Sequence, residues 1–251
     1  MGTAIASGLK RSFDALSSLT VCERNVDRHE SLRSLEIDVT ESNTNACKDA
    51  DVVLLAVKPQ DFESLNIADD LKEDAIVISI MAGVSMRKIR TVLNDHGPIV
   101  RVMPNLPALI GKGVSGFFAS NLSPDQKQTV ESILKTLGLA VEVKEEDDID
   151  KITALSGSGP AYVFYFLESL RDAAVDLGLD KQTAENLALE TLLGSAEYFK
   201  NGTSSLEELR ERVTSKGGTT EKALQVLHNC GFKESLAQAT KAAYERAKEL
   251  S

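Results

Sequence analysis

The sequence has 251 residues, no tryptophan, and only three cysteines and three histidines. Cys22, Cys47 and Cys230 have no CxxC spacing, which argues against a disulfide framework and the common zinc motifs. The histidines are far apart in the chain, so we expect neither a histidine-based triad nor a metal site. This sparse use of cysteine suits a reducing compartment, and we predict a cytoplasmic protein.

Long hydrophobic runs and an excess of basic residues are also absent. The longest apolar runs, DVVLLAV (51–57) and AIVISIMAGV (75–84), are about half of the ~20 residues that a membrane helix needs. No secretory signal is recognisable at the N-terminus. The net charge of −10 argues against general binding to nucleic acid or to an anionic membrane. We therefore expect no membrane and no nucleic-acid partner.

The pattern along the chain predicts two domains. Up to about residue 143, short apolar runs alternate with helical segments, which indicates an α/β domain with a parallel sheet covered on both faces. Ser123 and Pro124 are typical of a helix start within it. After the acidic segment KEEDDIDK (144–151) the spacing is helical only. We predict domains at 1–147 and 148–251, with a homodimer, or a higher oligomer, formed through apolar helix faces of the second.

The opening stretch MGTAIASGLK resembles the end of a dinucleotide-binding turn. Gly2 corresponds to the third glycine of G-x-G-x-x-G, although an ordinary slim helix would use the same small residues. The first strand and first two glycines of that fingerprint are not in this sequence. We therefore expect a gap in the sheet, reduced stability and weak cofactor binding, and we expect Met1 to be an internal methionine of a longer protein.

An acidic and a basic residue stand together about 20 residues after Gly2, where such folds contact the adenosine ribose. Glu23 would accept a hydrogen bond from a free 2′-hydroxyl, whereas Arg24 would pair with a 2′-phosphate. This leaves NADH and NADPH both open, with a preference for NADPH. A solvated strand end would explain the same residues.

Four further motifs follow predicted strands or begin a helix. We expect the first two to line the cofactor crevice, the third to hold a ligand group and the fourth to meet the nicotinamide carboxamide. They are AVKPQ (56–60), SIMAGVS (79–85), RVMPNLPALIGKG (101–113) with Asn105 at its centre, and ALSGSGPAY (154–162) with Ser158 before a helix. Strand termination, a rigid turn and a plain helix start remain alternative interpretations.

The most informative stretch is RVTSKGGTTEKAL (212–224). Two glycines and two threonines before a helix build a turn with free N–H groups, which suits a carboxylate. The order G-x-x-x-x-G-K-[ST] is missing, which excludes a P-loop.

Taken in order, these motifs resemble the pyrroline-5-carboxylate reductase family over essentially the whole chain. The resemblance implies a Rossmann-type doubly wound parallel sheet, here without its first strand, followed by an all-helical dimerisation domain. It also implies hydride transfer from NAD(P)H to 1-pyrroline-5-carboxylate to give L-proline, the last step of proline biosynthesis.

The resemblance also assigns roles to residues. Thr220 is expected to be the catalytic residue, with its hydroxyl on the ring nitrogen of the substrate. The expected substrate-binding residues are Glu146, Ser215, Gly217, Gly218 and Thr219. Among the expected cofactor-binding residues, Asn43 contacts the adenosine, and Ile80, Met81 and Ala82 lie by the nicotinamide. The others are Gly2, Arg24, Ala56, Val57, Lys58, Pro59, Asn105 and Ser158.

Three positions depart from the family pattern. Lys216 stands where proline is usual, Leu106 where threonine is usual, and Met81 where the family has a small residue. The last two are expected to tighten the pocket.

Two other functions stay open. One is another NAD(P)-dependent imine or hydroxyacid dehydrogenase that uses a lysine such as Lys216. The other is a truncated inactive isoform that acts through dimerisation.

Overall fold

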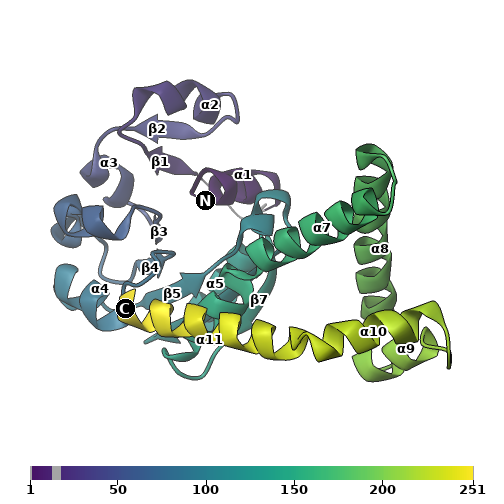
Figure 1. Ribbon diagram of the computed structural model, residues 1–251. Helices are drawn as coiled ribbons and strands as arrows, with labels where there is room; N and C mark the ends of the chain where they lie inside the picture. The colour runs from purple at the N-terminus through teal and green to yellow at the C-terminus, as the bar shows by residue number, and fades with distance from the viewer. Residues whose placement is uncertain (1, 13–17, 251) are drawn as a thin grey trace. The chain divides into compact units, whose positions relative to one another are not determined.

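The computed structural model describes residues 2–12 and 18–250, which form two compact units (Figure 1). The sheet unit comprises residues 1–158 and 243–251, and the helical unit comprises residues 159–242. The domain bounds expected from the sequence, 1–147 and 148–251, stay a prediction. The expectation about Met1 lies outside the described residues.

Short strands dominate the first half of the chain and helices the second. The strands are β1 (Thr20–Cys22), β2 (Asp38–Thr40), β3 (Val52–Leu55), β4 (Ile76–Ser79), β5 (Ile99–Met103), β6 (Gly113–Ser120) and β7 (Gly138–Glu142). The α-helices are α1 (Gly2–Ser12), α2 (His29–Arg33), α3 (Asn43–Cys47), α4 (Met86–Val92), α5 (Pro124–Lys135), α6 (Asp148–Ile152), α7 (Gly159–Asp176), α8 (Lys181–Asn201), α9 (Leu206–Arg212), α10 (Thr219–Asn229) and α11 (Phe232–Leu250). A π-helical segment, Thr153–Gly157, follows α6.

The main sheet has five strands in the order β3-β4-β5-β6-β7. β3, β4 and β5 are parallel, and β6 and β7 are parallel to each other. All residues of β4 are buried, as expected for a continuous apolar strand covered on both faces. β6 runs antiparallel to β5, which the sequence-based expectation of a parallel sheet did not include.

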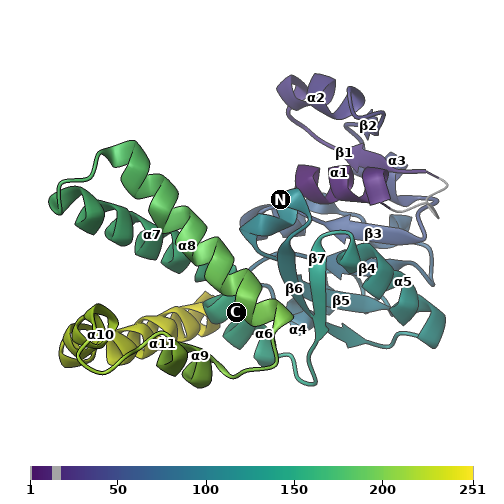
Figure 2. The same ribbon diagram turned by 90° about the vertical axis from the view of Figure 1, so that its right-hand side faces the viewer.

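Helices cover both faces of this sheet. On one face lie α1 and α5 (Figure 2). Ile5, Leu9, Ile133 and other buried side chains of these helices belong to one apolar cluster. On the other face, a second cluster contains Cys47 of α3 and Ile89 of α4. The Rossmann-type architecture expected from the sequence is therefore confirmed.

β1 and β2 form a separate two-stranded parallel sheet. Within residues 2–12 and 18–250, no strand pairs with the second edge of β1 or with the second edge of β3. This agrees with the expected gap in the sheet. The expected losses of stability and of cofactor affinity stay predictions.

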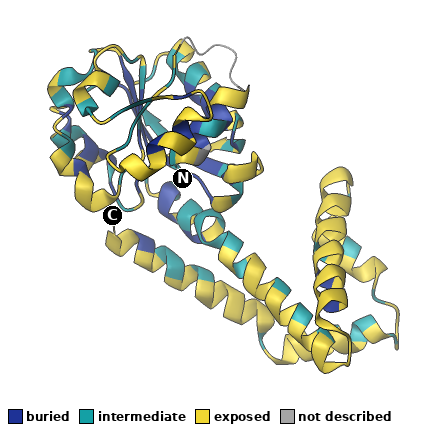
Figure 3. Ribbon diagram, turned by 90° about the horizontal axis from the view of Figure 1, so that it is seen from above, coloured by how far each residue is buried: buried dark blue, intermediate teal, exposed yellow. Residues whose placement is uncertain are grey.

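The helical unit buries little surface in a single copy. Most of its ribbon has the colour of exposed residues (Figure 3). Across residues 159–242 only Ala184 and Ala188 are buried, and large apolar side chains such as Phe164, Tyr165 and Leu193 are exposed. No helix in the described part of the chain is both long enough and apolar enough to cross a bilayer.

Candidate active site

The ends of β3, β4 and β5 bring three of the predicted motifs together. Because these strands are parallel and adjacent, the segments that follow them meet at one edge of the sheet, which we call the carboxyl edge. Ala56 follows β3 and is exposed, and Ala82 in the segment after β4 is exposed as well. Small exposed residues at this edge allow a ligand to approach the backbone closely.

The start of α1 reaches the same edge. A Cβ atom added to Gly2 would lie 3.0 Å from the Cβ atom of Ala56. A side chain at position 2 would therefore crowd Ala56 at the end of β3. The assignment of Gly2 to the cofactor-binding turn stays a prediction.

The charged residues after β1 have different surroundings. Glu23 Oε1 accepts a hydrogen bond from the Asn25 N–H at 2.9 Å, and Glu23 Oε2 pairs with Arg28 Nη1 at 3.3 Å. Arg24 is exposed and, among the described residues, forms no ion pair. The Glu23 carboxylate is therefore already bound, whereas the Arg24 guanidinium is accessible to a ligand.

Asn43, the first residue of α3, uses its carboxamide within the protein. Its Oδ1 accepts a hydrogen bond from Cys22 Sγ at 3.1 Å, and its Nδ2 donates to the Leu65 carbonyl at 3.0 Å. Burial raises the pKa of the Cys22 thiol, which keeps this thiol protonated as the donor. Asn43 thus connects the end of β1 to the segment after β3, and its contact with adenosine stays a prediction.

The residues of the AVKP motif are at least partly exposed, whereas Met81 is not. Val57 is half-buried, and Lys58 and Pro59 are exposed. Met81 is only 3% exposed, and its side chain belongs to the apolar cluster around α4. The Met81 side chain is therefore not exposed at the edge where it was predicted to tighten the pocket. Leu106, the other departure, is 48% exposed.

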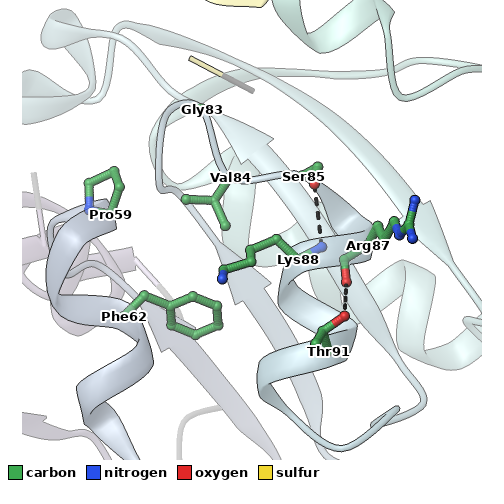
Figure 4. A pocket seen from close by; sticks show the side chains of 8 residues that line it. All are labelled: Pro59, Phe62, Gly83, Val84, Ser85, Arg87, Lys88 and Thr91. Carbon is green, nitrogen blue, oxygen red and sulfur yellow. Dashed lines mark hydrogen bonds between the residues drawn. The ribbon is translucent and has the colours of Figure 1, made fainter. Parts of the chain in front are cut away.

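A cavity of about 450 Å³ lies beside Pro59 (Figure 4). Phe62 and Val84 give it apolar walls, and Lys88, which forms an ion pair with Glu63, extends across it. The other lining residues are Gly83, Ser85, Arg87 and Thr91.

Asn105 connects two parts of the sheet unit. Its Oδ1 accepts a hydrogen bond from the Val114 N–H at 2.8 Å, and its Nδ2 donates to Ser156 Oγ at 3.2 Å. Ser156 lies in the π-helical segment, just before Ser158, whose N–H donates to the Thr153 carbonyl. The side chain of Asn105 thus fixes its own loop against this segment, and direct ligand contact by Asn105 or Ser158 stays a prediction.

The carboxylate of Glu146 belongs to a buried cluster of charges. Its Oε1 accepts hydrogen bonds from the Met86 N–H at 2.6 Å and from Arg101 Nη1 at 2.9 Å. Arg101 Nη2 also donates to Asp150 Oδ1 at 3.0 Å. Sequence reasoning missed Arg101 and Asp150, although a charged residue within the apolar run IVRVM is an available signal. The role of Glu146 in substrate binding stays a prediction.

In the helical unit, the predicted carboxylate loop forms one turn at the start of α10. Gly217 has a φ of 77°, which favours glycine, and Gly218 is the N-cap residue. Thr219 and Thr220 begin the helix, and N–H groups in a first helical turn have no partner within the helix. The N–H of Gly217 donates to Glu221 Oε2 at 2.7 Å. The turn therefore already binds a carboxylate, from a residue that sequence reasoning did not select.

The remaining loop residues stand close to this turn. A Cβ atom on Gly218 would lie 2.6 Å from Ser215 Oγ, so a larger residue there would require the Ser215 side chain to move. Ser215 and Lys216 are exposed, and Thr220 is half-buried.

The predicted site residues thus form two groups, one in each unit. Those assigned to the cofactor, together with Glu146, belong to the sheet unit, and residues 215–220 belong to the helical unit.

All three cysteines are free, and burial raises the pKa of Cys47 to about 11. The described ranges contain no group of three histidine, cysteine or acidic side chains placed to hold a metal.

Comparison with known families gives two matches. Residues 146–250 match the family described as pyrroline-5-carboxylate reductase dimerisation. Residues 1–83 match the family described as NADP oxidoreductase, coenzyme F420-dependent.

Individual proteins match over most or all of the chain. A pyrroline-5-carboxylate reductase of Pseudomonas aeruginosa is 41% identical over 218 residues, which cover 86% of this chain and 80% of that protein. The solved structure of a pyrroline-5-carboxylate reductase from Coxiella burnetii has 39% identity and a TM-score of 0.92, covering 100% of this chain and 94% of that one. The Plasmodium falciparum enzyme, solved with NADP bound, has 31% identity and a TM-score of 0.86 at the same coverage of both chains. The chain therefore belongs to the pyrroline-5-carboxylate reductase family.

Proposed function

We propose that this chain reduces 1-pyrroline-5-carboxylate to L-proline, the last step of proline biosynthesis, with a hydride from a nicotinamide cofactor. The observation that carries the proposal is the turn at the start of α10, where the Gly217 N–H already binds the Glu221 carboxylate. A substrate that is itself a carboxylate would use the same donors once Glu221 is displaced. The family to which the chain belongs supports the same substrate.

A nicotinamide dinucleotide fits the residues of the carboxyl edge. The small exposed residues Ala56 and Ala82 leave backbone accessible to a flat ring and to phosphates. The match of residues 1–83 and the NADP-bound relative support such a cofactor. Ile80, Met81 and Ala82 would lie by the nicotinamide, and Ala56, Val57, Lys58 and Pro59 beside the rest of the molecule. When bound, this cofactor supplies the hydride.

We favour NADPH over NADH as this cofactor. The Glu23 carboxylate is held by Asn25 and Arg28 and is less available to a ribose 2′-hydroxyl. The exposed Arg24 guanidinium suits a 2′-phosphate.

The protein's own contribution to the reaction is positioning. The loop of Gly217, Gly218 and Thr219, in which the Gly218 N–H already donates to the Ser215 carbonyl at 3.0 Å, holds the substrate carboxylate, and the Thr220 hydroxyl bonds to the ring nitrogen. The carbon of a protonated C=N bond is already electrophilic, so orientation and exclusion of water contribute more than a strong acid does. This agrees with the absence of a histidine among the assigned residues.

We further propose that two copies associate through the helical unit. The matched dimerisation family covers this region, and the exposed side chains of Phe164, Tyr165 and Leu193 provide apolar surface. Assembly beyond the dimer stays a prediction.

Substitution of Thr220 tests the proposal. Thr220→Val keeps the shape of the side chain but removes the hydroxyl, and we expect kcat/KM for pyrroline-5-carboxylate to fall by about tenfold or more because one hydrogen bond to the substrate is lost. Thr220→Ser, which keeps the hydroxyl, should retain most of the activity. Thr240→Val is the matched control, because the Thr240 hydroxyl donates to the Leu236 carbonyl of its own helix. Wild-type turnover by Thr220→Val would contradict the role of Thr220.

A further inference from the structure

Arg101 is a charged residue in the middle of a buried strand. It lies in β5 between apolar neighbours and is 3% exposed. A guanidinium held this far from water is tolerated only where acceptors and opposite charges surround it. The groups that it contacts therefore indicate its role.

Two carboxylates bind the two ends of this guanidinium. Arg101 Nη1 donates to Glu146 Oε1 at 2.9 Å, and Arg101 Nη2 donates to Asp150 Oδ1 at 3.0 Å. The side chain of Asp150 is 9% exposed and that of Glu146 is 27% exposed. Since Glu146 precedes α6 and Asp150 lies in it, Arg101 fixes this segment to the sheet.

Glu146 extends the contact to the loop after β4, which comprises residues 80–85. Its Oε1 accepts the Met86 N–H at 2.6 Å, in addition to the Arg101 contact. Met86 is the first residue of α4, and its N–H has no acceptor within the helix. The loop is thus held at one end by β4 and at the other by Glu146.

We infer that Arg101 is a positioning residue for hydride transfer, acting through Glu146 and the Met86 N–H on the loop of residues 80–85. This inference rests on the proposed function, because that loop contains Ile80, Met81 and Ala82, which are assigned to the nicotinamide. Arg101 orients the Glu146 carboxylate, and the carboxylate sets where the loop ends. The same Glu146 oxygen accepts from Arg101 and from the first N–H of α4, which directly follows this loop.

Two conservative variants and their combination test this chain of contacts. Arg101→Lys keeps the positive charge, but one ammonium group cannot reproduce the two-ended fork between Glu146 and Asp150. Glu146→Gln keeps an acceptor oxygen for the Met86 N–H. It removes the negative charge through which Arg101 orients this side chain. We expect each variant to lower kcat by about tenfold to a hundredfold, because small displacements of a reacting group have effects of this size. The KM for NADPH should change much less, because the Arg24 contact is untouched.

The double variant separates positioning from stabilisation. Because both residues act through one contact, the kcat of Arg101→Lys/Glu146→Gln should be no lower than the kcat of whichever single variant is less active. The fluorescence emission of bound NADPH, followed by titration without substrate, should shift in both single variants because it reports the surroundings of the nicotinamide ring.

Lys127→Met is the control. It removes an exposed ion pair between Lys127 and Glu142 in the sheet unit without touching the loop, and it should keep the wild-type kcat. Wild-type kcat and emission in both single variants, with only a lower Tm, would overturn the inference, and so would losses that multiply in the double variant. If Arg101→Lys fails to fold, Glu146→Gln alone decides by the same readouts.

The failure of the proposed function is a separate result. If the wild-type protein binds NADPH but does not reduce pyrroline-5-carboxylate, the proposed function is wrong. The emission of bound NADPH then still decides the inference: a shift in the variants supports it, and an unchanged emission overturns it.

Discussion

At the scale of single residues, the surroundings of a side chain decide which functional group a ligand can reach. Glu23 and Arg24 are adjacent in the sequence, but only Arg24 is without an ion pair among the described residues. Likewise, the carboxamides of Asn43 and Asn105 form hydrogen bonds to other residues of the protein. Sequence reasoning selected these residues, and their contacts with a ligand stay predictions. It could not supply their partners, because those come from elements distant in the chain.

Arg24→Ala should reduce the preference for NADPH. The loss of a charged contact to a 2′-phosphate should lower kcat/KM for NADPH by about tenfold, while kcat/KM for NADH stays close to its wild-type value. Steady-state kinetics with both cofactors measure the ratio. Arg33→Ala, an exposed arginine of α2, should leave it unchanged. An equal fall with both cofactors would show that Arg24 does not read the 2′ position.

Glu221→Gln should lower the KM for pyrroline-5-carboxylate several-fold, with little change in kcat. The substitution keeps the side chain next to the Gly217 N–H but removes a negative charge that competes with the substrate carboxylate. The difference from the wild type should shrink as salt is added. Glu207→Gln, in the first turn of α9, is the matched control. An increased KM would mean that the loop depends on the Glu221 charge and does not exchange it for the substrate.

At the scale of elements, local signals predicted the regular parts of the fold well. The apolar runs at 51–57 and 75–84 contain β3 and β4, and Ser123 caps α5 in a reciprocal capping box with Gln126. These elements were predictable because their pattern is set by residues close together in the sequence.

The direction of β6 was harder to predict. Only a short 3₁₀ turn, Leu106–Ile110, joins β5 to β6, which is too short for the crossover that a parallel strand needs. The π-helical segment Thr153–Gly157 has no local signal of its own in the sequence, since its hydrogen bonds include that of Ser156 to the distant Asn105.

The N-cap of α8 gives a prediction for the helical unit. The Asp180 carboxylate accepts a hydrogen bond from the Thr183 N–H at 3.0 Å, and contacts with Thr183 lower the pKa of Asp180 below its ordinary value of 3.8. Since the folded-state pKa is lowered, this stabilisation is present above pH 3.8 and is lost as the pH falls through the folded-state pKa.

Asp180→Ala should therefore lower the Tm at pH 7, and the difference from the wild type should narrow under acid conditions. Asp180→Asn, which also caps helices well, should lose less at pH 7. Thermal unfolding followed by circular dichroism at several pH values measures both. A difference that stays constant with pH would contradict the capping role of the charge.

At the scale of the whole molecule, the candidate binding sites are distributed over the two units. The sheet unit carries the carboxyl edge and the Arg101 cluster, and the helical unit carries the α10 turn and the exposed apolar helices. The family to which the chain belongs accounts for both. Sequence motifs were sufficient to find this division, because each motif is short and continuous.

The function that follows from this division has one direct test. Purified protein is mixed with NADPH and 1-pyrroline-5-carboxylate, and the loss of cofactor absorbance is followed together with the formation of proline. We predict that proline appears in equal amount to the NADPH consumed, and that NADH is used less well. Binding of NADPH without formation of proline would contradict the proposed reaction, and failure to bind either cofactor, even with the weak affinity expected of a sheet without its first strand, would contradict the assignment of the carboxyl edge.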